Sequence, residues 1–153
     1  MLTYRFCMLT WLNGEISMDK WDRAHIEAAG VYARLSSARK LQVGCVIVQN
    51  NRIISIGYNG TLPGADNDCE TETDSGLVTR PEVIHAEMNS ILKLAASTES
   101  GSGATAYITH APCLDCSKHM IQAGIARVVY AQAYRDPAGT DLLVKHGVTV
   151  EQL

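Results

Sequence analysis

The sequence lacks a surplus of positive charge and any hydrophobic run of membrane-spanning length. Its 153 residues contain 13 Lys and Arg against 16 Asp and Glu, which gives a formal net charge of −3. Proteins that hold polynucleotides through phosphate contacts usually carry a basic surplus, so the charge argues against a polynucleotide partner. No apolar stretch approaches the ~20 residues of a transmembrane helix, and we expect no membrane partner.

The sequence also lacks the marks of a secreted, disulfide-bonded protein. The apolar stretch at residues 6–12 is short and leads into Asn13, Gly14 and Glu15 rather than a small-residue cleavage site. The five cysteines form an odd set, which argues against a disulfide framework. We therefore expect a reducing, cytoplasmic setting in which the thiols are free to bind a metal.

The first half of the chain reads as one helix followed by a β-hairpin. Apolar or bulky residues recur at three- and four-residue steps from 18 to 35, as in an amphipathic helix. Two β-branched runs, 43–48 and 53–58, flank Asn50-Asn51, which can adopt the positive φ angles of a tight hairpin turn. Neither run alternates cleanly between apolar and polar residues, so we expect both strands to be buried on both faces.

Helices and strands alternate in the second half. The expected helices are 85–96, 112–123 and 140–146, and the expected strands are 104–109, 127–131 and 148–151. Such alternation produces parallel strands joined by right-handed crossovers. The predicted fold class is α/β, with a single mixed β-sheet of about five strands and helices on both faces. Residues 61–81 are polar and acidic, and so long an irregular segment in a compact domain is usually functional or disordered.

Two short motifs, each at the start of an expected helix, carry the chemistry. They are His85-Ala86-Glu87 and Pro112-Cys113-Leu114-Asp115-Cys116. Cys113 and Cys116 face the same side of a helix, whose N-terminus favours the thiolates that bind zinc. With His85 they make three protein ligands and leave a fourth position for water, as in catalytic zinc sites. Glu87 need not bind the metal and can accept a proton from the activated water.

Each motif alone has a simpler interpretation. A Cys-x-x-Cys pair can be a redox pair or half of a structural zinc site, and His-x-Glu is common at solvated helix starts. A structural tetrathiolate needs a second Cys-x-x-Cys, which the sequence lacks. A redox pair leaves His85 and Glu87 unexplained. Together and in this order, the motifs match the known signature of zinc-dependent nucleobase deaminases.

Further segments resemble the deoxycytidylate deaminase family. They are residues 42–48, 57–64 and 121–125, of which the second contains Gly-Tyr-Asn-Gly. The resemblance covers about Trp21 to the C-terminus. It implies a cytidine deaminase-like three-layer α/β/α fold, one catalytic zinc ion, and hydrolysis of dCMP to dUMP with release of ammonia, which supplies the precursor of dTMP.

The resemblance also implies roles for individual residues. His85, Cys113 and Cys116 would bind zinc, Glu87 would carry protons to N3 and the leaving amino group, the backbone of Ala86 would contact the pyrimidine carbonyl, and Asn59 would contact the sugar hydroxyl. The alternative for Asn59 is a turn residue between glycines.

Two loops at strand ends, where α/β sheets bind ligands, hold further candidates. We predict that Arg39, Lys40, Tyr134 and Arg135 contact the phosphate and the base, the alternative being ordinary surface charge. His110 precedes the second motif closely enough to face the pocket, and we predict that it contacts substrate.

The family resemblance extends to regulation. Deoxycytidylate deaminases commonly form hexamers that dCTP activates and dTTP inhibits, through a nucleotide site near the Gly-Tyr-Asn-Gly segment. Gly60, Asp66 and Asp68 are the predicted allosteric residues here, because carboxylates suit the Mg²⁺ that accompanies a triphosphate. The alternative is that residues 61–81 form a solvated flap without a ligand.

Residues 1–17 lie outside the resemblance. We expect them to be a dispensable N-terminal extension, with 18–153 as the deaminase domain, although their aromatic side chains could instead pack on a neighbouring subunit. Other functions also stay open: a deaminase of cytidine, deoxycytidine or another amino-substituted ring, a tRNA-editing enzyme, and a non-catalytic zinc-stabilised binding module.

Overall fold

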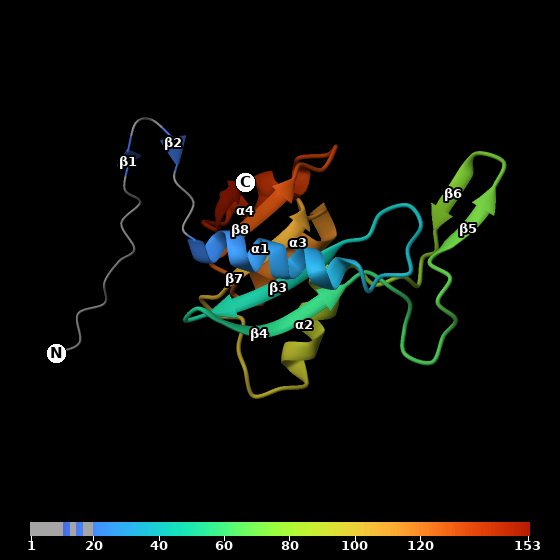
Figure 1. Cartoon of the computed structure of the whole chain (residues 1–153), viewed down its shortest axis with the longest axis horizontal. Helices are drawn as coiled ribbons and strands as arrows, with labels where there is room; N and C mark the ends of the chain where they lie inside the picture. Colours follow the sequence, from blue (N-terminus) through green and yellow to red (C-terminus); the bar gives the residue numbers. More distant parts are fainter. Residues whose placement is uncertain (1–10, 13–14, 17–19) are drawn as a thin grey trace.

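A five-stranded mixed sheet forms the centre of the molecule in the computed structural model, which describes residues 11–12, 15–16 and 20–153 (Figure 1). The strands, in their order across the sheet, are β4 (Arg52–Tyr58), β3 (Gly44–Gln49), β7 (Thr105–His110), β8 (Arg127–Gln132) and β9 (Thr149–Gln152). The helices are α1 (Lys20–Ala33), α2 (Ala86–Ala95), α3 (Leu114–Gln122) and α4 (Ala138–Lys145). The predicted fold class is confirmed.

The pairing of the strands follows the expected pattern. β3 and β4 form an antiparallel hairpin whose turn residues Asn50 and Asn51 have φ angles of 50° and 61°. β7 runs antiparallel to β3, whereas β7, β8 and β9 are parallel to one another. The carboxyl ends of β7 and β8 therefore lie at the same edge of the sheet, where α/β proteins bind ligands.

Side chains on opposite faces of the sheet belong to two separate hydrophobic clusters. Val46 and Val48 of β3 pack with Ala29 of α1 on one face. Cys45 and Ile47, the alternate residues of the same strand, pack on the other face against α2, α3 and α4. Alternation of side chains along a strand produces this division, and it explains why β3 is buried from Gly44 to Val48. The expected burial on both faces is wrong for β4, an edge strand whose Arg52 and Ile53 are exposed.

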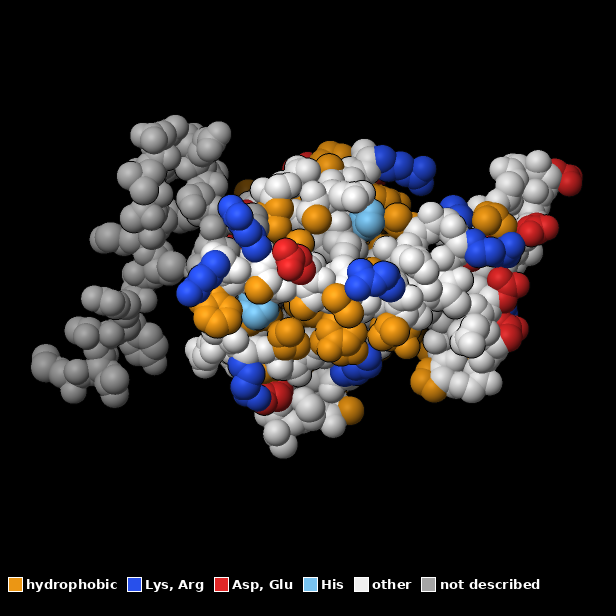
Figure 2. All heavy atoms as spheres, viewed as in Figure 1, with side chains coloured by type: hydrophobic (Ala, Val, Ile, Leu, Met, Phe, Trp, Pro, Cys, Tyr) orange, Lys and Arg blue, Asp and Glu red, His pale blue; other side chains and the backbone are white. Residues whose placement is uncertain are grey.

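The outer surface of α1 is partly apolar, and the hairpin at residues 70–79 is acidic (Figure 2). Val31 and Leu35, at the end of α1 and just after it, are 50% and 60% exposed. Glu72 and Asp74 are exposed on the hairpin. The surface of α1 and the surface of the hairpin therefore differ in chemical character.

The segment from 61 to 81 differs from its prediction as a long irregular stretch. It contains the antiparallel hairpin of β5 (Glu70–Thr73) and β6 (Gly76–Thr79), which projects from the body of the molecule (Figure 1). Gly76, which follows the turn, has a φ of 106°, and glycine adopts this backbone conformation without strain. The prediction is therefore wrong for residues 70–79, because a hairpin made mostly of polar residues shows no clear hydrophobic periodicity.

The N-terminal segment is described only in part. Backbone pairing joins β1 (Trp11–Leu12) to β2 (Glu15–Ile16). Residues 1–10, 13–14 and 17–19 lie outside the described residues, so the predicted extension at 1–17 falls mostly there. Among the helices that the structure describes, each is too short or too polar to cross a bilayer.

Candidate active site

The two sequence motifs meet at the starts of two neighbouring helices. His85 is the N-cap residue of α2, and Cys113 is the N-cap residue of α3. The helices begin one and two residues later than predicted, so Pro112 precedes the N-cap instead of opening the helix. Neither N-cap side chain caps its helix by a hydrogen bond, which leaves both side chains available to a ligand.

Three donor atoms form a compact cluster at these helix starts. His85 Nδ1 lies 3.5 Å from Cys113 Sγ and 3.4 Å from Cys116 Sγ, and the three atoms lie within 4.8 Å of one another. A tetrahedral zinc ion with ordinary bond lengths keeps nitrogen and sulfur ligands about 3.6 Å apart. The donor set and its spacing therefore fit zinc.

The surroundings of the cluster favour the deprotonated form of one thiol. Hydrogen bonding to Cys116 and to His85 lowers the pKa of Cys113 to about 4. Hydrogen bonding to Cys113, together with burial, raises the pKa of Cys116. These contacts therefore favour a thiolate at Cys113, and a bound cation would favour the second thiolate as well.

Glu87 lies in the first turn of α2, two residues beyond His85. It is only 4% exposed, and this burial raises the pKa of its carboxyl group above the usual range. Glu87 lines the same cavity as His85 and Cys113. A buried carboxyl group beside a candidate metal site can hold or release a proton during a reaction.

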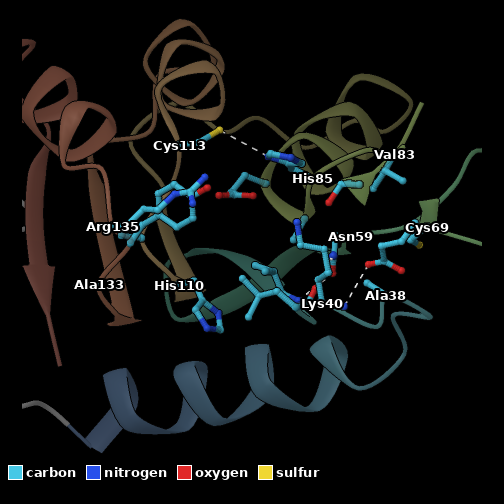
Figure 3. Close-up of a pocket in the computed structure, with 18 residues that line it drawn as sticks. Ala38, Lys40, Asn59, Cys69, Val83, His85, His110, Cys113, Ala133 and Arg135 are labelled. Atoms are coloured by element: carbon cyan, nitrogen blue, oxygen red, sulfur yellow. Dashed lines mark hydrogen bonds between the residues drawn. The ribbon is translucent and has the colours of Figure 1, made fainter. Parts of the chain in front are cut away.

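A cavity of about 440 Å³ opens beside the cluster (Figure 3). His85 and Cys113 lie on one side of it, and His110 and Lys40 lie on the other. Six of the predicted substrate-binding residues line it: Lys40, Asn59, Ala86, His110, Tyr134 and Arg135. They come from segments far apart in the sequence, and the fold brings them together at one edge of the sheet.

The surroundings define the state of the polar groups of two of these residues, Asn59 and His110. Asn59 Oδ1 accepts a hydrogen bond from the backbone N–H of Val43 at 2.8 Å, and Asn59 Nδ2 donates to the Leu41 carbonyl at 2.8 Å. Its amide therefore holds the cavity wall and keeps one hydrogen and one lone pair for a ligand. Burial lowers the pKa of His110, which favours the neutral imidazole.

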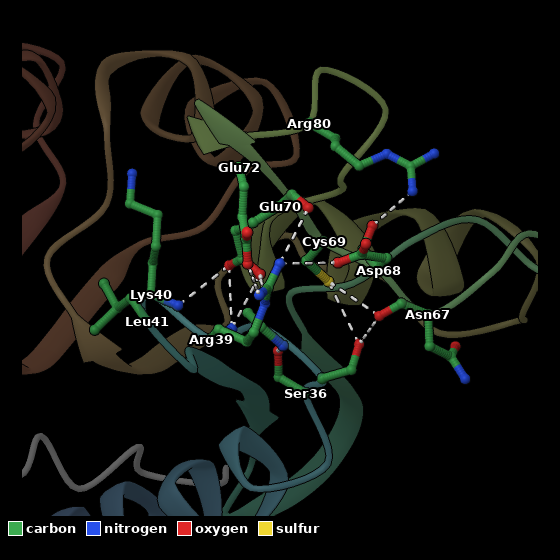
Figure 4. A network of polar contacts seen from close by, with 12 residues as sticks. Ser36, Arg39, Lys40, Leu41, Asn67, Asp68, Cys69, Glu70, Glu72 and Arg80 are labelled. Carbon is green, nitrogen blue, oxygen red and sulfur yellow. Dashed lines mark hydrogen bonds and ion pairs between the residues drawn. The ribbon is translucent and has the colours of Figure 1, made fainter. Parts of the chain in front are cut away.

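Arg39 is not brought to the cavity, although it was predicted to contact substrate. Its guanidinium group forms ion pairs with Asp68 at 3.4 Å and Glu72 at 3.0 Å, and it lies 3.8 Å from Glu70 (Figure 4). The hydrogen bond to Glu72 raises the pKa of Arg39 further above its usual value.

The predicted allosteric residues also lie outside this cavity. Asp68 pairs with Arg39, and Asp66 pairs with Arg80 at 2.7 Å. Gly60 pairs with Ile84 through two backbone hydrogen bonds of 3.1 and 2.8 Å. Gly60 is therefore linked to the residue that immediately precedes His85.

Glu70 lines the cavity and was missed by the sequence prediction. Its side chain is 2% exposed, and its carboxylate accepts hydrogen bonds from the backbone N–H groups of Arg39 and Lys40 at 3.1 to 3.2 Å (Figure 4). It thereby fixes the loop that carries Lys40. No signal in the acidic 61–81 segment distinguishes Glu70 from the exposed carboxylates around it.

The fold and the cavity define a class of protein. In this three-layer α/β/α domain, two helix starts bring an imidazole and two thiols together, and a buried carboxyl group lines the cavity beside them. This arrangement is typical of a metal-dependent enzyme. The family model described as "Cytidine and deoxycytidylate deaminase zinc-binding region" matches residues 19–132. The chain belongs to this family and is a deaminase, so the resemblance stated from the sequence is confirmed.

Individual relatives agree with the family assignment. The chain is 39% identical to ComE operon protein 2 of Bacillus subtilis over 138 residues, which cover 87% of this chain and 71% of that protein. It is 36% identical to a deoxycytidylate deaminase of Schizosaccharomyces pombe, with 92% of this chain and 46% of that protein covered. The chain thus spans less than half the length of the yeast relative.

A solved structure shows the same fold. The crystal structure of the dCMP deaminase from cyanophage S-TIM5, in complex with dCMP and dUMP, superposes with a TM-score of 0.83 at 38% identity. The match covers 90% of this chain and 100% of that chain. The similarity therefore extends over most of this chain and the whole of that one.

Proposed function

We propose that the protein hydrolyses dCMP to dUMP and ammonia. The observation that carries the proposal is one cavity that joins the His85, Cys113 and Cys116 cluster with the cationic residues Lys40 and Arg135. A nucleoside monophosphate has a base at one end and a dianion at the other, and this distribution of groups complements it. The names of the yeast and phage relatives support the same substrate.

The residues of the chain have separate tasks in this reaction. His85, Cys113 and Cys116 hold zinc, which when bound supplies an acidified water for attack on C4. Glu87 would take one proton from that water and deliver it to N3, which keeps it in dUMP, and would then carry the remaining hydroxyl proton to the amino group, which leaves as ammonia. The backbone of Ala86 contacts the pyrimidine carbonyl and orients the ring, and the remaining capacity of the Asn59 amide serves the sugar hydroxyl.

The cationic residues of the cavity select the phosphate. Lys40 and Arg135 are exposed residues of the cavity lining, and Arg135 lies over the ring of Tyr134. Charge-assisted hydrogen bonds from such groups favour a monophosphate over a nucleoside. Partial burial lowers the pKa of His110 and favours the neutral imidazole, which serves as a hydrogen-bonding group toward the substrate.

One assay tests the substrate. Ammonia release is measured in parallel from dCMP, CMP, deoxycytidine and dCTP, with Arg135→Gln as the variant and Arg52→Gln as a surface control. We expect dCMP to be preferred and the KM for dCMP to rise in the Arg135 variant alone. Equal turnover of deoxycytidine and dCMP would exclude the phosphate-binding role and favour a nucleoside deaminase.

We further propose regulation by dCTP and dTTP in a hexamer, with Mg²⁺ accompanying the triphosphate near Gly60, Asp66 and Asp68. The backbone pairing of Gly60 with Ile84 supports it, because a ligand that moves Gly60 also moves the residue before His85. Asp66 and Asp68 are now paired with arginines, so the effector has to displace these ion pairs.

A reducing, cytoplasmic setting is part of the same proposal. Cys113 and Cys116 are free thiols in the described part of the chain, and so are Cys45 and Cys69. Thiolate ligands are lost on oxidation to a disulfide, so the metal cluster requires a reducing compartment.

A further inference from the structure

Three glycines among the described residues lie too close to a neighbouring backbone to carry a side chain. A methyl group at Gly44 would lie 2.0 Å from the Ala29 carbonyl oxygen. A methyl group at Gly57 or Gly139 would lie 2.1 Å from the carbonyl oxygen of Ala86 or of Pro112, respectively. Real Cβ atoms are essentially never found below 3.0 Å, so each of these contacts requires glycine.

Two of the three contacts involve the backbone next to the metal cluster. Gly57 of β4 faces Ala86, the residue between His85 and Glu87, and also lies close to the Ser90 N atom, which a methyl group would meet at 2.6 Å. A hydrogen bond also joins α2 to β4, since the Ser55 hydroxyl donates to the Ser90 carbonyl at 2.7 Å. β4 therefore determines where the first turn of α2 lies.

Gly139 plays the corresponding part for the second motif. It is buried in the first turn of α4, and a methyl group there would meet Pro112 O at 2.1 Å and Cys113 O at 2.9 Å. Cys113 O accepts hydrogen bonds from the backbone N–H and the hydroxyl of Ser117, both at 3.0 Å. A shift of Cys113 O would therefore disturb the turn that presents Cys113 and Cys116 together.

We propose that Gly57 and Gly139 are positioning residues for the metal site, each setting the place of one ligand-bearing helix start. The proposal rests on the proposed zinc chemistry, and neither glycine touches the metal or the substrate. Gly57 acts on His85 and Glu87 through Ala86, and Gly139 acts on Cys113. Together the two glycines set the distance between the His85 imidazole and the two thiols, which is about the ligand–ligand distance of a tetrahedral zinc site.

Gly44 provides a matched control. Its contact is equally close and also involves a carbonyl oxygen, but the partner is Ala29 of α1, on the opposite face of the sheet from α2 and α3. Gly44→Ala should therefore destabilise the fold as Gly57→Ala and Gly139→Ala do, without moving either ligand-bearing helix.

The experiment measures zinc affinity by competition with a chromophoric chelator, beside the denaturant midpoint of each metal-free protein. We expect Gly57→Ala and Gly139→Ala to bind zinc about 10- to 100-fold more weakly, the usual loss when the supports of metal ligands are disturbed. Gly44→Ala should keep wild-type affinity despite a lowered midpoint. Cobalt in place of zinc should show altered absorption bands in the first two variants only.

The outcomes separate the two levels of the proposal. Failure of the wild-type protein to bind one zinc ion would overturn the proposed function itself. Wild-type binding with unchanged affinity in both glycine variants, or an equal loss in Gly44→Ala, would overturn the positioning role alone.

If Gly139→Ala does not fold, Asp136→Ala carries the test, since exposed Asp136 accepts the Ala138 N–H at 2.9 Å and holds the first turn of α4. Zinc affinity in that variant should fall, and a wild-type value would overturn the role of Gly139.

Discussion

Glu87 and Cys116 lie next to each other in the structure but have different chemical tasks. Cys116 belongs to the donor cluster with His85, whereas Glu87 lines the cavity beside it and is not one of the three donors. Substitution of each residue should therefore separate metal binding from proton transfer.

Glu87→Gln should retain zinc and the fold but lose activity by about 10²- to 10⁴-fold, the usual contribution of a general acid–base group. The amide has almost the shape of the carboxyl group but cannot carry the proton. The measurement is kcat for dCMP together with zinc content by atomic absorption. Wild-type turnover in the zinc-loaded variant would contradict the role of Glu87.

Cys116→Ser should lose both the metal and the activity. A hydroxyl is a weaker zinc ligand than a thiolate, and bound zinc stabilises the folded state against the unfolded one. The Tm of the variant should therefore be lower than that of the wild-type protein in zinc-containing buffer. After chelation, the difference between the two Tm values should be smaller. Full zinc occupancy in the variant would show that Cys116 is not a ligand.

At the scale of elements, α1 is fastened to the sheet by a buried polar network. Arg127 of β8 pairs with Asp22 of α1 at 2.8 and 2.9 Å and also pairs with Glu151 of β9. The Tyr107 hydroxyl donates to Asp22 at 2.6 Å. Burial raises the pKa of Asp22, but the hydrogen bonds from Arg127 and Tyr107 and the charge of Arg127 outweigh it, so the net pKa is lowered.

A lowered carboxyl pKa makes the stability from this network depend on pH. The contribution is fully present above the unfolded-state pKa of ~4 and is lost as the pH falls through the lower folded-state value. Asp22→Asn should reduce the free energy of unfolding by about 1–3 kcal/mol at pH 7, because a charge-assisted buried hydrogen bond is lost. Denaturant titrations at pH 7 and at acidic pH should show this difference shrinking below pH ~4.

Glu99→Gln serves as the control for Asp22. Glu99 pairs with Arg52 at 2.7 Å on the surface, and such exposed pairs contribute about 0–1 kcal/mol. The control should change little at either pH. A pH-independent difference between Asp22→Asn and the wild-type protein would show that the network does not act through ionised Asp22.

At the scale of the whole molecule, the open matter is assembly and regulation. We expect dCTP to raise, and dTTP to lower, the rate of dCMP turnover at low substrate concentration. We expect the mass in solution to be that of a hexamer. An allosteric effector must bind two states with different affinity, so the informative measurement is the shift of the curve beside the mass by light scattering. Hyperbolic curves unmoved by either nucleotide, or a stable monomer, would contradict the regulatory proposal.

Deletion of residues 1–17 tests the division of the chain into extension and domain. The family match begins at residue 19, and the cavity is lined by residues from 38 onward. We expect the shortened protein to keep kcat and KM for dCMP. A large fall in kcat, or fewer subunits in the assembly measured in solution, would show that the segment takes part in the active assembly.

The sequence by itself determined the helices and strands of the five-stranded domain and the identity of the donor cluster, but not the hairpin of β5 and β6. Hairpin turns and helix starts depend on neighbouring residues, so Asn50-Asn51 and the two motifs could be interpreted locally. The spacing of Cys113 and Cys116 within one helix turn also follows from local geometry. The predicted cluster therefore agrees with the atoms that lie together in the structure.

Only the tertiary structure decided which polar residues face the cavity. Arg39 and Lys40 are adjacent and equally plausible from the sequence, yet Arg39 turns to the acidic hairpin while Lys40 lines the cavity. Glu70 is buried beneath them, although nothing distinguishes it locally from Glu72. These outcomes depend on packing between segments about thirty residues apart, where several similar charges compete for the same partners. The close approach of Gly139 to Cys113 is likewise decided by packing of α4 on α3, because neither local propensity nor periodicity encodes the distance between two helices.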